Sequence, residues 1–271
     1  MSLRGIWSAV ITPVNEAFEP DVARAIPYYR ELLASGCDGI NLLGTTGQAM
    51  SFAVAARAYL MDAVAQSGLP TDRFMCGTGA ASLEDAIALT NAAFDAGFAA
   101  ALVMPPFFYR DAGDDGMMRY FDELVGATDI SIVLYNFPRM SGIAFHPALV
   151  ARLIEAFPER IIGIKDSSND SAYQREVIAN HQDLAVFPGS EERLLEGLAY
   201  GTAGCISGSV ALWAPLAQEV YSKRDPEVGK HLSAQRAQLG STSLIPHVHA
   251  RLAAEKKDDA WKRVVPPLIP V

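Results

Sequence analysis

The chain lacks the features that mark secreted and disulfide-stabilised proteins. Its 271 residues include only three cysteines, Cys37, Cys76 and Cys205, and none belongs to a C-x-x-C pair. An odd number of widely spaced cysteines in apolar surroundings indicates reduced, buried thiols rather than a disulfide framework. The first residues also lack the charged and apolar regions of a secretory leader. These absences favour a cytoplasmic protein.

Long apolar runs and clusters of basic residues are missing as well. No stretch approaches the roughly 18 apolar residues of a membrane span, so we expect a soluble protein without a membrane partner. The 22 Lys and Arg residues are outnumbered by 31 Asp and Glu, which gives a net charge of −9. Nucleic-acid backbones are bound through clustered basic side chains. We therefore expect no nucleic-acid partner.

The signatures of metal and dinucleotide sites are also lacking. No Gly-x-Gly-x-x-Gly follows a predicted strand, which argues against a dinucleotide-binding sheet. None of the five histidines ends a predicted strand, and the pair His247 and His249 falls in a C-terminal helical region. Since zinc sites need several converging ligands, we expect neither a metal nor another cofactor.

The chain does contain eight short apolar runs that alternate with longer amphipathic stretches. Runs that are apolar on both faces and separated by helices indicate a buried parallel sheet. Eight such units in a chain of this length favour a closed (β/α)₈ TIM barrel over an open doubly wound sheet. The predicted strands are Gly5–Ile11, Gly39–Leu43, Arg73–Cys76, Ala100–Met104, Ile130–Tyr135, Ile161–Lys165, Leu184–Phe187 and Gly204–Ser207. The predicted helices are Val22–Ala34, Ala53–Gln66, Leu83–Asp95, Gly116–Val125, Pro147–Ala156, Ser171–Asn180 and Glu191–Tyr200.

The chain is predicted to divide into a barrel and a short extension. Residues 1–222 form the predicted barrel, and residues 223–271 form a C-terminal helical extension packed on it. The pattern stays helical from Trp213 to about Lys262, with breaks near Gly240 and Pro246. Prolines prevent the last residues, 264–271, from continuing a helix.

Lys165 is the first candidate for chemistry, because the functional residues of a barrel collect at the C-terminal ends of its strands. It ends the predicted strand Ile161–Lys165, where alternation puts it on one face with Ile161 and Gly163. If that face points inward, Gly163 leaves space beneath a partly desolvated lysine, whose neutral amine is a nucleophile. The alternative is a lysine whose ammonium group reaches out of the strand end into solvent.

Tyr135 ends the preceding strand at the same edge of the predicted barrel. Neighbouring strands lie about 4.8 Å apart, so its phenol could reach a group attached to Lys165 and transfer protons. The alternative is a core tyrosine with a satisfied hydroxyl.

Two loops carry further candidates. Gly44-Thr-Thr-Gly47 follows the second strand, and its hydroxyls and backbone N–H groups suit a small carboxylate. Glu191 follows the seventh strand, with Ser190 before it as a helix N-cap. Glu191 either complements the helix dipole or accepts hydrogen bonds from substrate hydroxyls.

These motifs together resemble the dihydrodipicolinate synthase and N-acetylneuraminate lyase family. The resemblance covers roughly Gly5 to Leu212. It is carried by Gly44-Thr-Thr-Gly47, Pro105-Pro-Phe-Phe-Tyr109, Tyr135-Asn-Phe-Pro138, Gly163-Ile-Lys-Asp166, Gly189-Ser-Glu191 and Gly204-Cys-Ile-Ser207.

The resemblance implies a homotetrameric or dimeric (β/α)₈ barrel that forms an imine between Lys165 and pyruvate or another 2-oxo acid. It also implies that Tyr135 relays protons and that Thr45 and Thr46 hold the pyruvate carboxylate. The carbonyl of Ile206 would face the same pocket. A protonated imine withdraws electrons more strongly than a ketone, which stabilises the enamine that forms when a carbon–carbon bond breaks.

Three positions depart from the family pattern. Met140 stands where the synthase branch has an arginine for the carboxylate of its aldehyde, and Arg139 is one position early. Phe108 stands where the synthase has a tyrosine that serves a neighbouring subunit, with Tyr109 beside it as an alternative aromatic contact. Gln48 replaces the usual glutamate after the Gly-Thr-Thr-Gly motif.

These departures argue against lysine biosynthesis but leave the imine chemistry in place. We expect a lyase that acts on a 2-oxo acid, with a 2-oxo-3-deoxy sugar acid as the substrate class, because Glu191 could bind hydroxyls. Aldol cleavage and dehydration both remain open. The alternatives are 4-hydroxy-tetrahydrodipicolinate synthase, a barrel that binds an oxo acid without catalysis, and a metal-dependent aldolase.

Overall fold

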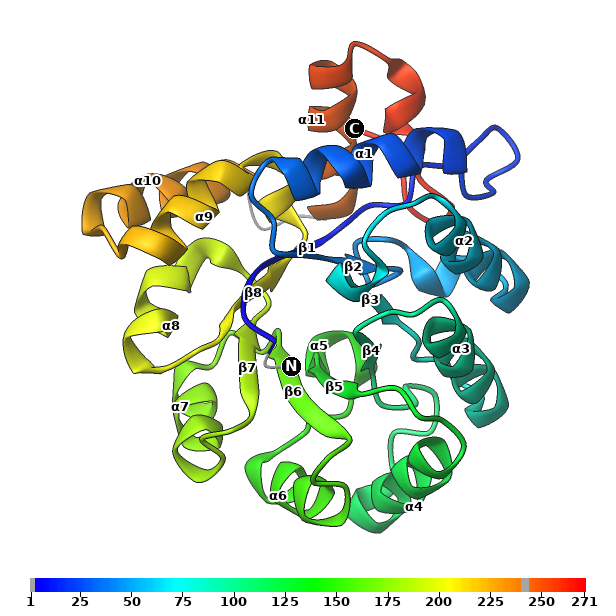
Figure 1. The fold of residues 1–271 in the computed structure, drawn as a ribbon, viewed down its shortest axis with the longest axis vertical. Helices are drawn as coiled ribbons and strands as arrows, with labels where there is room; N and C mark the ends of the chain where they lie inside the picture. Colours follow the sequence, from blue (N-terminus) through cyan, green and yellow to red (C-terminus); the bar gives the residue numbers. More distant parts are fainter. Residues whose placement is uncertain (1–2, 240–243) are drawn as a thin grey trace.

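The computed structural model describes residues 3–239 and 244–271, which form a barrel of eight parallel strands surrounded by helices (Figure 1). The strands pair in the order β7-β6-β5-β4-β3-β2-β1-β8. Ala203 N–H, just before β8, donates to the carbonyl of Val186 on β7 at 2.9 Å, which closes the ring. The predicted TIM barrel is confirmed. Its strands are β1 Gly5–Ala9, β2 Gly39–Leu42, β3 Phe74–Gly77, β4 Ala100–Val103, β5 Ile132–Asn136, β6 Ile161–Asp166, β7 Ala185–Pro188 and β8 Gly204–Ser207.

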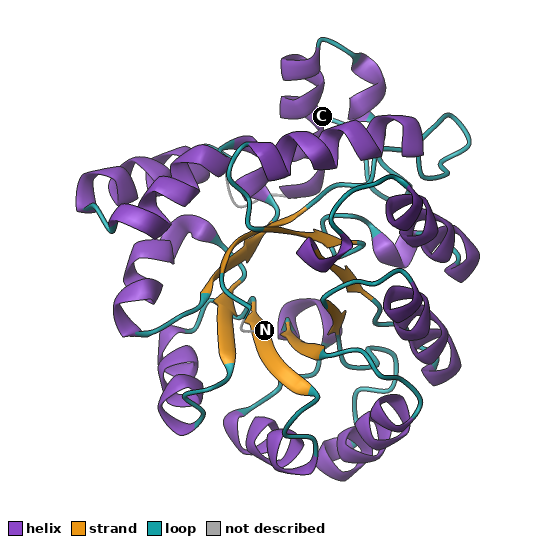
Figure 2. Ribbon diagram, in the orientation of Figure 1, coloured by secondary structure: helices purple, strands orange, loops and turns teal. Residues whose placement is uncertain are grey.

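Helices enclose the strands from outside (Figure 2). Four of the predicted helices have the predicted bounds, and the others differ by a few residues at their ends. Glu191–Tyr200 is the exception, because it begins as a 3₁₀ turn, Glu191–Arg193, before α8. The α-helices are α1 Val22–Ala34, α2 Val54–Gln66, α3 Leu83–Asp95, α4 Gly113–Gly126, α5 Pro138–Ser141, α6 Pro147–Ala156, α7 Ser171–Asn180, α8 Leu194–Tyr200, α9 Ala214–Lys223, α10 Pro226–Ala237 and α11 Leu244–Lys256.

Side chains of each strand alternate between two cores. One core fills the barrel and the other lies between strands and helices. The strands are therefore apolar on both faces, as a parallel sheet that is covered on both faces requires. The interior core includes Trp7, Ala9, Met75, Leu102, Val133, Tyr135, Phe187 and Ile206.

β6 departs from the simple alternation that the sequence predicts. Its register against β5 pairs Ile132 with Ile161 but Val133 with Gly163, so Ile162 is an extra residue on β6. Lys165 and Gly163 share a face, but the prediction that Ile161 shares it too was wrong, because the bulge moves Ile161 into the outer core. Gly163 also leaves no open space, since a Cβ there would lie 2.8 Å from the carbonyl oxygen of Ala185. The glycine instead lets β7 approach closely.

The C-terminal segment returns to the barrel after α10. In Figure 1, α11 and the chain end lie beside α1, where Arg24 bonds to Asp258 at 3.2 Å. The predicted break near Pro246 was wrong, because this proline lies in the first turn of α11, where its missing N–H removes no intrahelical bond. The predicted break near Gly240 lies outside the described residues. The proline-rich end is non-helical, as predicted, and the division at residues 222 and 223 stays a prediction.

The three cysteines are free and buried, as the sequence predicts. Burial raises the pKa of the Cys37 and Cys76 thiols to about 12. Within residues 3–239 and 244–271, no helix is both long and apolar enough to cross a membrane.

Candidate active site

Lys165 and Tyr135 lie side by side inside the C-terminal end of the barrel. They are register partners on β6 and β5. The Lys165 Nζ lies 4.4 Å from the centroid of the Tyr135 ring, and each of the two residues is only 4% exposed. An ammonium group above a phenol ring gains a cation–π interaction, which strengthens as water is excluded. The lysine is therefore held inside the barrel and does not extend into solvent.

Asp166, the residue after the lysine, points away from it and fixes the end of β6. Its Oδ1 accepts from Asn136 Nδ2 at 2.8 Å, and its Oδ2 accepts from Gln174 Nε2 at 2.7 Å. The backbone N–H and hydroxyl of Ser168 also donate to this carboxylate. A buried carboxylate with so many donors is satisfied without Lys165. Asp166 is thus a positioning residue that sequence reasoning did not single out.

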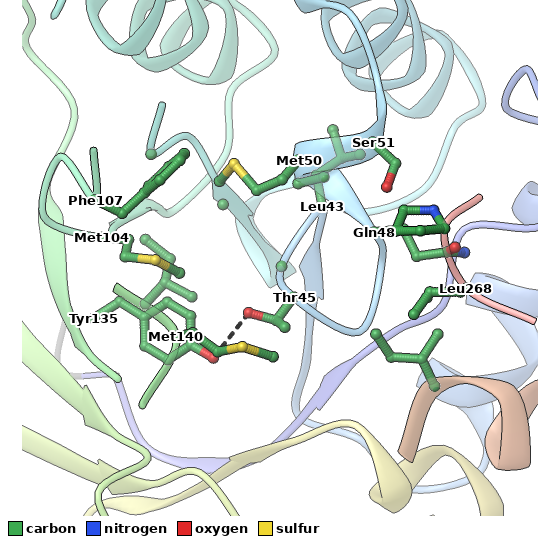
Figure 3. A pocket seen from close by; sticks show the side chains of 17 residues that line it. Leu43, Thr45, Gln48, Met50, Ser51, Met104, Phe107, Tyr135, Met140 and Leu268 are labelled. Atoms are coloured by element: carbon green, nitrogen blue, oxygen red, sulfur yellow. Dashed lines mark hydrogen bonds between the residues drawn. The ribbon is translucent and has the colours of Figure 1, made fainter. Parts of the chain in front are cut away.

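The Gly44–Gly47 loop brings a hydroxyl to the phenol. Thr45 Oγ1 and the Tyr135 hydroxyl lie 3.2 Å apart, within hydrogen-bond distance (Figure 3). Thr46 is buried against the loop after β8, where a Cβ on Gly208 would lie only 2.4 Å from its Oγ1. Ile206 is fully buried in the interior core that includes Tyr135. The structure therefore gathers Lys165 with these four predicted residues at one end of the barrel.

A pocket of about 320 Å³ opens from this end of the barrel toward the surface. Tyr135 and Thr45 contribute to its wall, together with the β2–α2 and β4–α4 loops, α5 and the C-terminal segment (Figure 3). Several apolar lining residues were not identified as functional from the sequence. They could have been suspected only from their places beside the catalytic motifs. The lining residues are Leu43, Gly44, Thr45, Gln48, Ala49, Met50, Ser51, Gly77, Gly79, Leu102, Met104, Phe107, Tyr135, Met140, Ile245, Pro267 and Leu268.

Glu191 begins the 3₁₀ turn between β7 and α8. It is 1% exposed, and its Oε1 accepts a hydrogen bond from Trp213 Nε1 at 2.8 Å. Like Lys165, Thr46 and Ile206, it is not among the described residues that line the pocket. Ser190 caps the 3₁₀ turn through its hydroxyl, as predicted. The other carboxylate oxygen of Glu191, Oε2, is buried and has no hydrogen-bond partner among the described residues, so the hydroxyl-binding role of Glu191 stays a prediction.

The aromatic loop after β4 lines this chain's own pocket through Phe107, and the contacts expected of Phe108 and Tyr109 stay predictions. Phe108 and Tyr109 are exposed and pack edge to face, with ring centroids 5.2 Å apart. Phe107, one residue earlier, lines the pocket. On α5, Met140 also lines it, while the Arg139 guanidinium lies over the Phe137 ring at 5.7 Å. The one-residue offset of the arginine thus takes its charge away from the described lining.

Gln48 connects the Gly44–Gly47 loop to the C-terminal segment. Its Oε1 accepts from the backbone N–H of Val265 at 2.8 Å, and its Nε2 lies 3.5 Å from His249 Nε2. The other ring nitrogen of His249 lies 2.8 Å from the carbonyl of Trp261, which requires a proton on Nδ1. Burial lowers the pKa of His249 from 6.5 to about 4. A neutral amide therefore pairs with a neutral imidazole.

Both ring nitrogens of His249 are thus occupied by contacts with Gln48 and Trp261, which gives this residue a structural role. Throughout the part of the chain that the structure describes, no three His, Cys, Asp or Glu residues converge as ligands would. The chemistry that the site can perform is that of a buried amine, a phenol and a threonine hydroxyl.

Comparisons with known proteins agree with this geometry. The profile of the Dihydrodipicolinate synthetase family matches residues 2–253. An uncharacterized DapA-like lyase of Chloroflexus aurantiacus is 31% identical over 278 residues, covering 99% of this chain and 92% of that protein. A 4-hydroxy-tetrahydrodipicolinate synthase of Methanothrix thermoacetophila is 32% identical over 207 residues, covering 75% of this chain and 68% of that protein.

Solved structures share the whole fold. Dihydrodipicolinate synthase from Agrobacterium tumefaciens is 27% identical with a TM-score of 0.91, covering 99% of this chain and 94% of that chain. The pyruvate complex of dihydrodipicolinate synthase from Acinetobacter baumannii is 25% identical with a TM-score of 0.89, covering 100% of this chain and 94% of that chain. The family match, the barrel and the curated relatives agree, and the chain is a lyase that belongs to the dihydrodipicolinate synthetase family.

Proposed function

We propose that this lyase holds pyruvate, or the pyruvate portion of a larger 2-oxo acid, as an imine on Lys165. The observation that carries the proposal is the contact chain from the Lys165 ammonium to the Tyr135 ring and from the Tyr135 hydroxyl to Thr45. An amine, a proton-transferring phenol and a hydroxyl for a carboxylate are the three groups that imine formation from a 2-oxo acid needs. A related synthase with pyruvate bound supports the choice of oxo acid.

In the proposed reaction, the neutral Lys165 amine attacks the ketone carbon of pyruvate. Tyr135 transfers the protons that allow water to leave and the iminium to form. The iminium then accepts the electron pair that a broken carbon–hydrogen or carbon–carbon bond leaves behind. Thr45 and Thr46 would hold the carboxylate, and the Ile206 carbonyl would face the same pocket.

The structure gives different support to the two substrate hypotheses. The sugar-acid hypothesis depends on Glu191, whose Oε1 accepts from Trp213 and whose Oε2 has no hydrogen-bond partner among the described residues. The alternative, 4-hydroxy-tetrahydrodipicolinate synthase, matches the names of several relatives. It needs a cation for the second carboxylate, and Met140 lines the pocket at that position. The described lining holds no cation for a second carboxylate, and the side chains in it that can hydrogen-bond hydroxyls are those of Thr45, Gln48, Ser51 and Tyr135.

We also propose that the chain forms a homotetramer or a dimer in the cytoplasm. The exposed Phe108 and Tyr109 pair supports an assembly, because solvent-exposed aromatic pairs gain from burial against a second subunit. The three free, buried cysteines support a reducing compartment.

Exchange of the pyruvate methyl protons in D₂O tests the proposal. An enamine on Lys165 takes up deuterium at the methyl carbon each time it is reprotonated, and NMR follows the loss of the methyl signal. Lys165→Arg keeps the charge but should abolish exchange, because a guanidinium remains protonated and forms no imine. If the barrel only binds the oxo acid, the methyl signal will decrease no faster than it does without enzyme.

A further inference from the structure

The wall of the pocket beyond Tyr135 and Thr45 is made of apolar side chains. Met50, Met104, Phe107 and Met140 stand around the opening in Figure 3, and they come from three separate barrel loops. The C-terminal segment adds Ile245 and Leu268. Because apolar side chains come from several separate elements, they surround the whole opening of the pocket.

The few polar groups in this lining are already occupied or lie at its edges. The Gln48 side-chain amide is hydrogen-bonded to the backbone N–H of Val265 and to the ring of His249. Thr45 and Tyr135 bond to each other at the inner end, and Ser51 is exposed. No Asp, Glu, Lys, Arg or His occurs among the described residues that form the lining. Lys165 adjoins it, with its Nζ over the ring of the lining residue Tyr135.

This composition disfavours both a polyhydroxylated and a carboxylate-bearing second substrate. Each hydroxyl that leaves water without a new partner costs about 1–3 kcal/mol. A buried carboxylate without a cation costs more. An apolar substituent instead gains by leaving water, at roughly 25 cal/mol for each Å² buried. Methionine and phenylalanine also make favourable sulfur–aromatic and ring contacts with an aromatic group.

We infer that the second substrate is an aldehyde whose substituent is apolar and about the size of a six-membered ring. The inference rests on the proposed imine at Lys165. A pocket of about 320 Å³ lies near the lower end of the range of roughly 300–1,000 Å³ for small-molecule sites. It therefore suits one ring beside the pyruvate portion better than a long chain.

The corresponding reaction is an aldol addition or its reverse. The enamine carbon derived from the pyruvate methyl group attacks the aldehyde carbon, and the new carbon–carbon bond forms as the carbonyl π electrons move to oxygen. That oxygen takes a proton through Tyr135. Water then hydrolyses the imine, frees Lys165 and releases a 4-hydroxy-2-oxo acid that bears the ring at carbon 4. No oxidant or reductant is consumed.

The test offers different aldehydes to the same enzyme, with pyruvate as the common donor. Benzaldehyde and cyclohexanecarbaldehyde are each offered with pyruvate, against glyceraldehyde and aspartate semialdehyde. The apolar wall predicts a kcat/KM at least about tenfold higher for the ring-bearing aldehydes. Equal or better use of glyceraldehyde or aspartate semialdehyde overturns the inference.

Two variants of one half-exposed residue test the wall itself. Met140→Leu keeps the apolar surface, and Met140→Gln has nearly the same length but adds an amide. Met140→Gln should raise the KM for benzaldehyde about tenfold, while Met140→Leu stays within about twofold. Equal effects of the two variants would show that the polarity of this wall does not select the substrate.

Methyl exchange with wild-type enzyme separates the two proposals. Exchange without preference for ring-bearing aldehydes overturns the substrate inference and leaves the imine proposal standing. Absence of exchange overturns the imine proposal, and the inference that rests on it falls too.

Discussion

The Lys165 Nζ lies 4.4 Å from the centre of the Tyr135 ring, and the two residues are direct register partners on adjacent strands. The pairing depends on the extra residue Ile162, because the bulge sets which residues of β6 face β5 farther along the strand. A one-residue change of register would turn the lysine out of the barrel. The backbone irregularity of β6 therefore determines where the amine points.

Tyr135→Phe tests whether the phenol transfers protons. The substitution keeps the ring beside Lys165 and removes the hydroxyl that approaches Thr45, so the fold should persist. If the phenol relays protons, kcat for pyruvate methyl exchange should fall by about 10²–10⁴-fold. Near-normal exchange in a folded Tyr135→Phe protein would assign the relay to another group.

Glu191→Ala tests the structural role of a residue first considered for substrate binding. The change leaves the buried Trp213 N–H without its acceptor, which should lower the free energy of unfolding by about 1–3 kcal/mol in urea titrations. Glu191→Gln keeps a carbonyl acceptor and should lose less. A stable Glu191→Ala protein with a raised KM for a 2-oxo-3-deoxy sugar acid would instead assign Glu191 the hydroxyl-binding role.

Much of the barrel follows from local patterns along the chain. Apolar runs and helix signals predicted eight strands in a closed barrel, and β8 has the predicted bounds Gly204–Ser207. The gathering of Lys165, Tyr135 and Thr45 follows from the geometry of a barrel, whose strand ends converge on one face. These features depend on residue types that repeat at regular spacing, which a sequence displays directly.

The remaining features depend on contacts that the sequence does not display. Ile161 and Ile162 are identical in chemistry, so no pattern indicates which of them is the extra residue. Glu191 meets Trp213, 22 residues away, through the packing of the layer outside the strands. Gln48 meets Val265 from the far end of the chain. Long-range packing decides each of these three outcomes.

Gln48→Glu tests the neutral pairing between the Gly44–Gly47 loop and the C-terminal segment. A glutamate would keep the acceptor for Val265 N–H but would place a carboxylate against the His249 Nε2 lone pair. A nearby negative charge favours the protonated ring, so the pKa of His249 should rise from about 4. NMR titration of the ring protons measures this change. An unaltered pKa would mean that the two side chains do not interact in solution.

His249 should make the stability of the protein fall in mild acid. Its pKa is about 4 in the folded chain against 6.5 ordinarily, so the neutral ring is favoured by folding. This stabilisation is complete above pH 6.5 and is lost as the pH falls toward 4, by on the order of 3 kcal/mol.

Urea titrations at several pH values check this dependence. His249→Asn retains a donor for the Trp261 carbonyl but has no titrating ring. It should lose less stability than the wild type between pH 6.5 and 4. Parallel losses in the two proteins would assign the acid sensitivity to carboxylates elsewhere.

Borohydride reduction in the presence of pyruvate tests the central proposal most directly, because it converts an imine into a stable covalent adduct. Intact mass measurement should show one reduced pyruvate per chain, and peptide mapping should locate it on Lys165, the buried amine beside Tyr135. Lys165→Arg should carry no adduct. An adduct on an exposed residue such as Lys223 or Lys230, or no adduct at all, would contradict the assignment of Lys165 as the imine-forming residue.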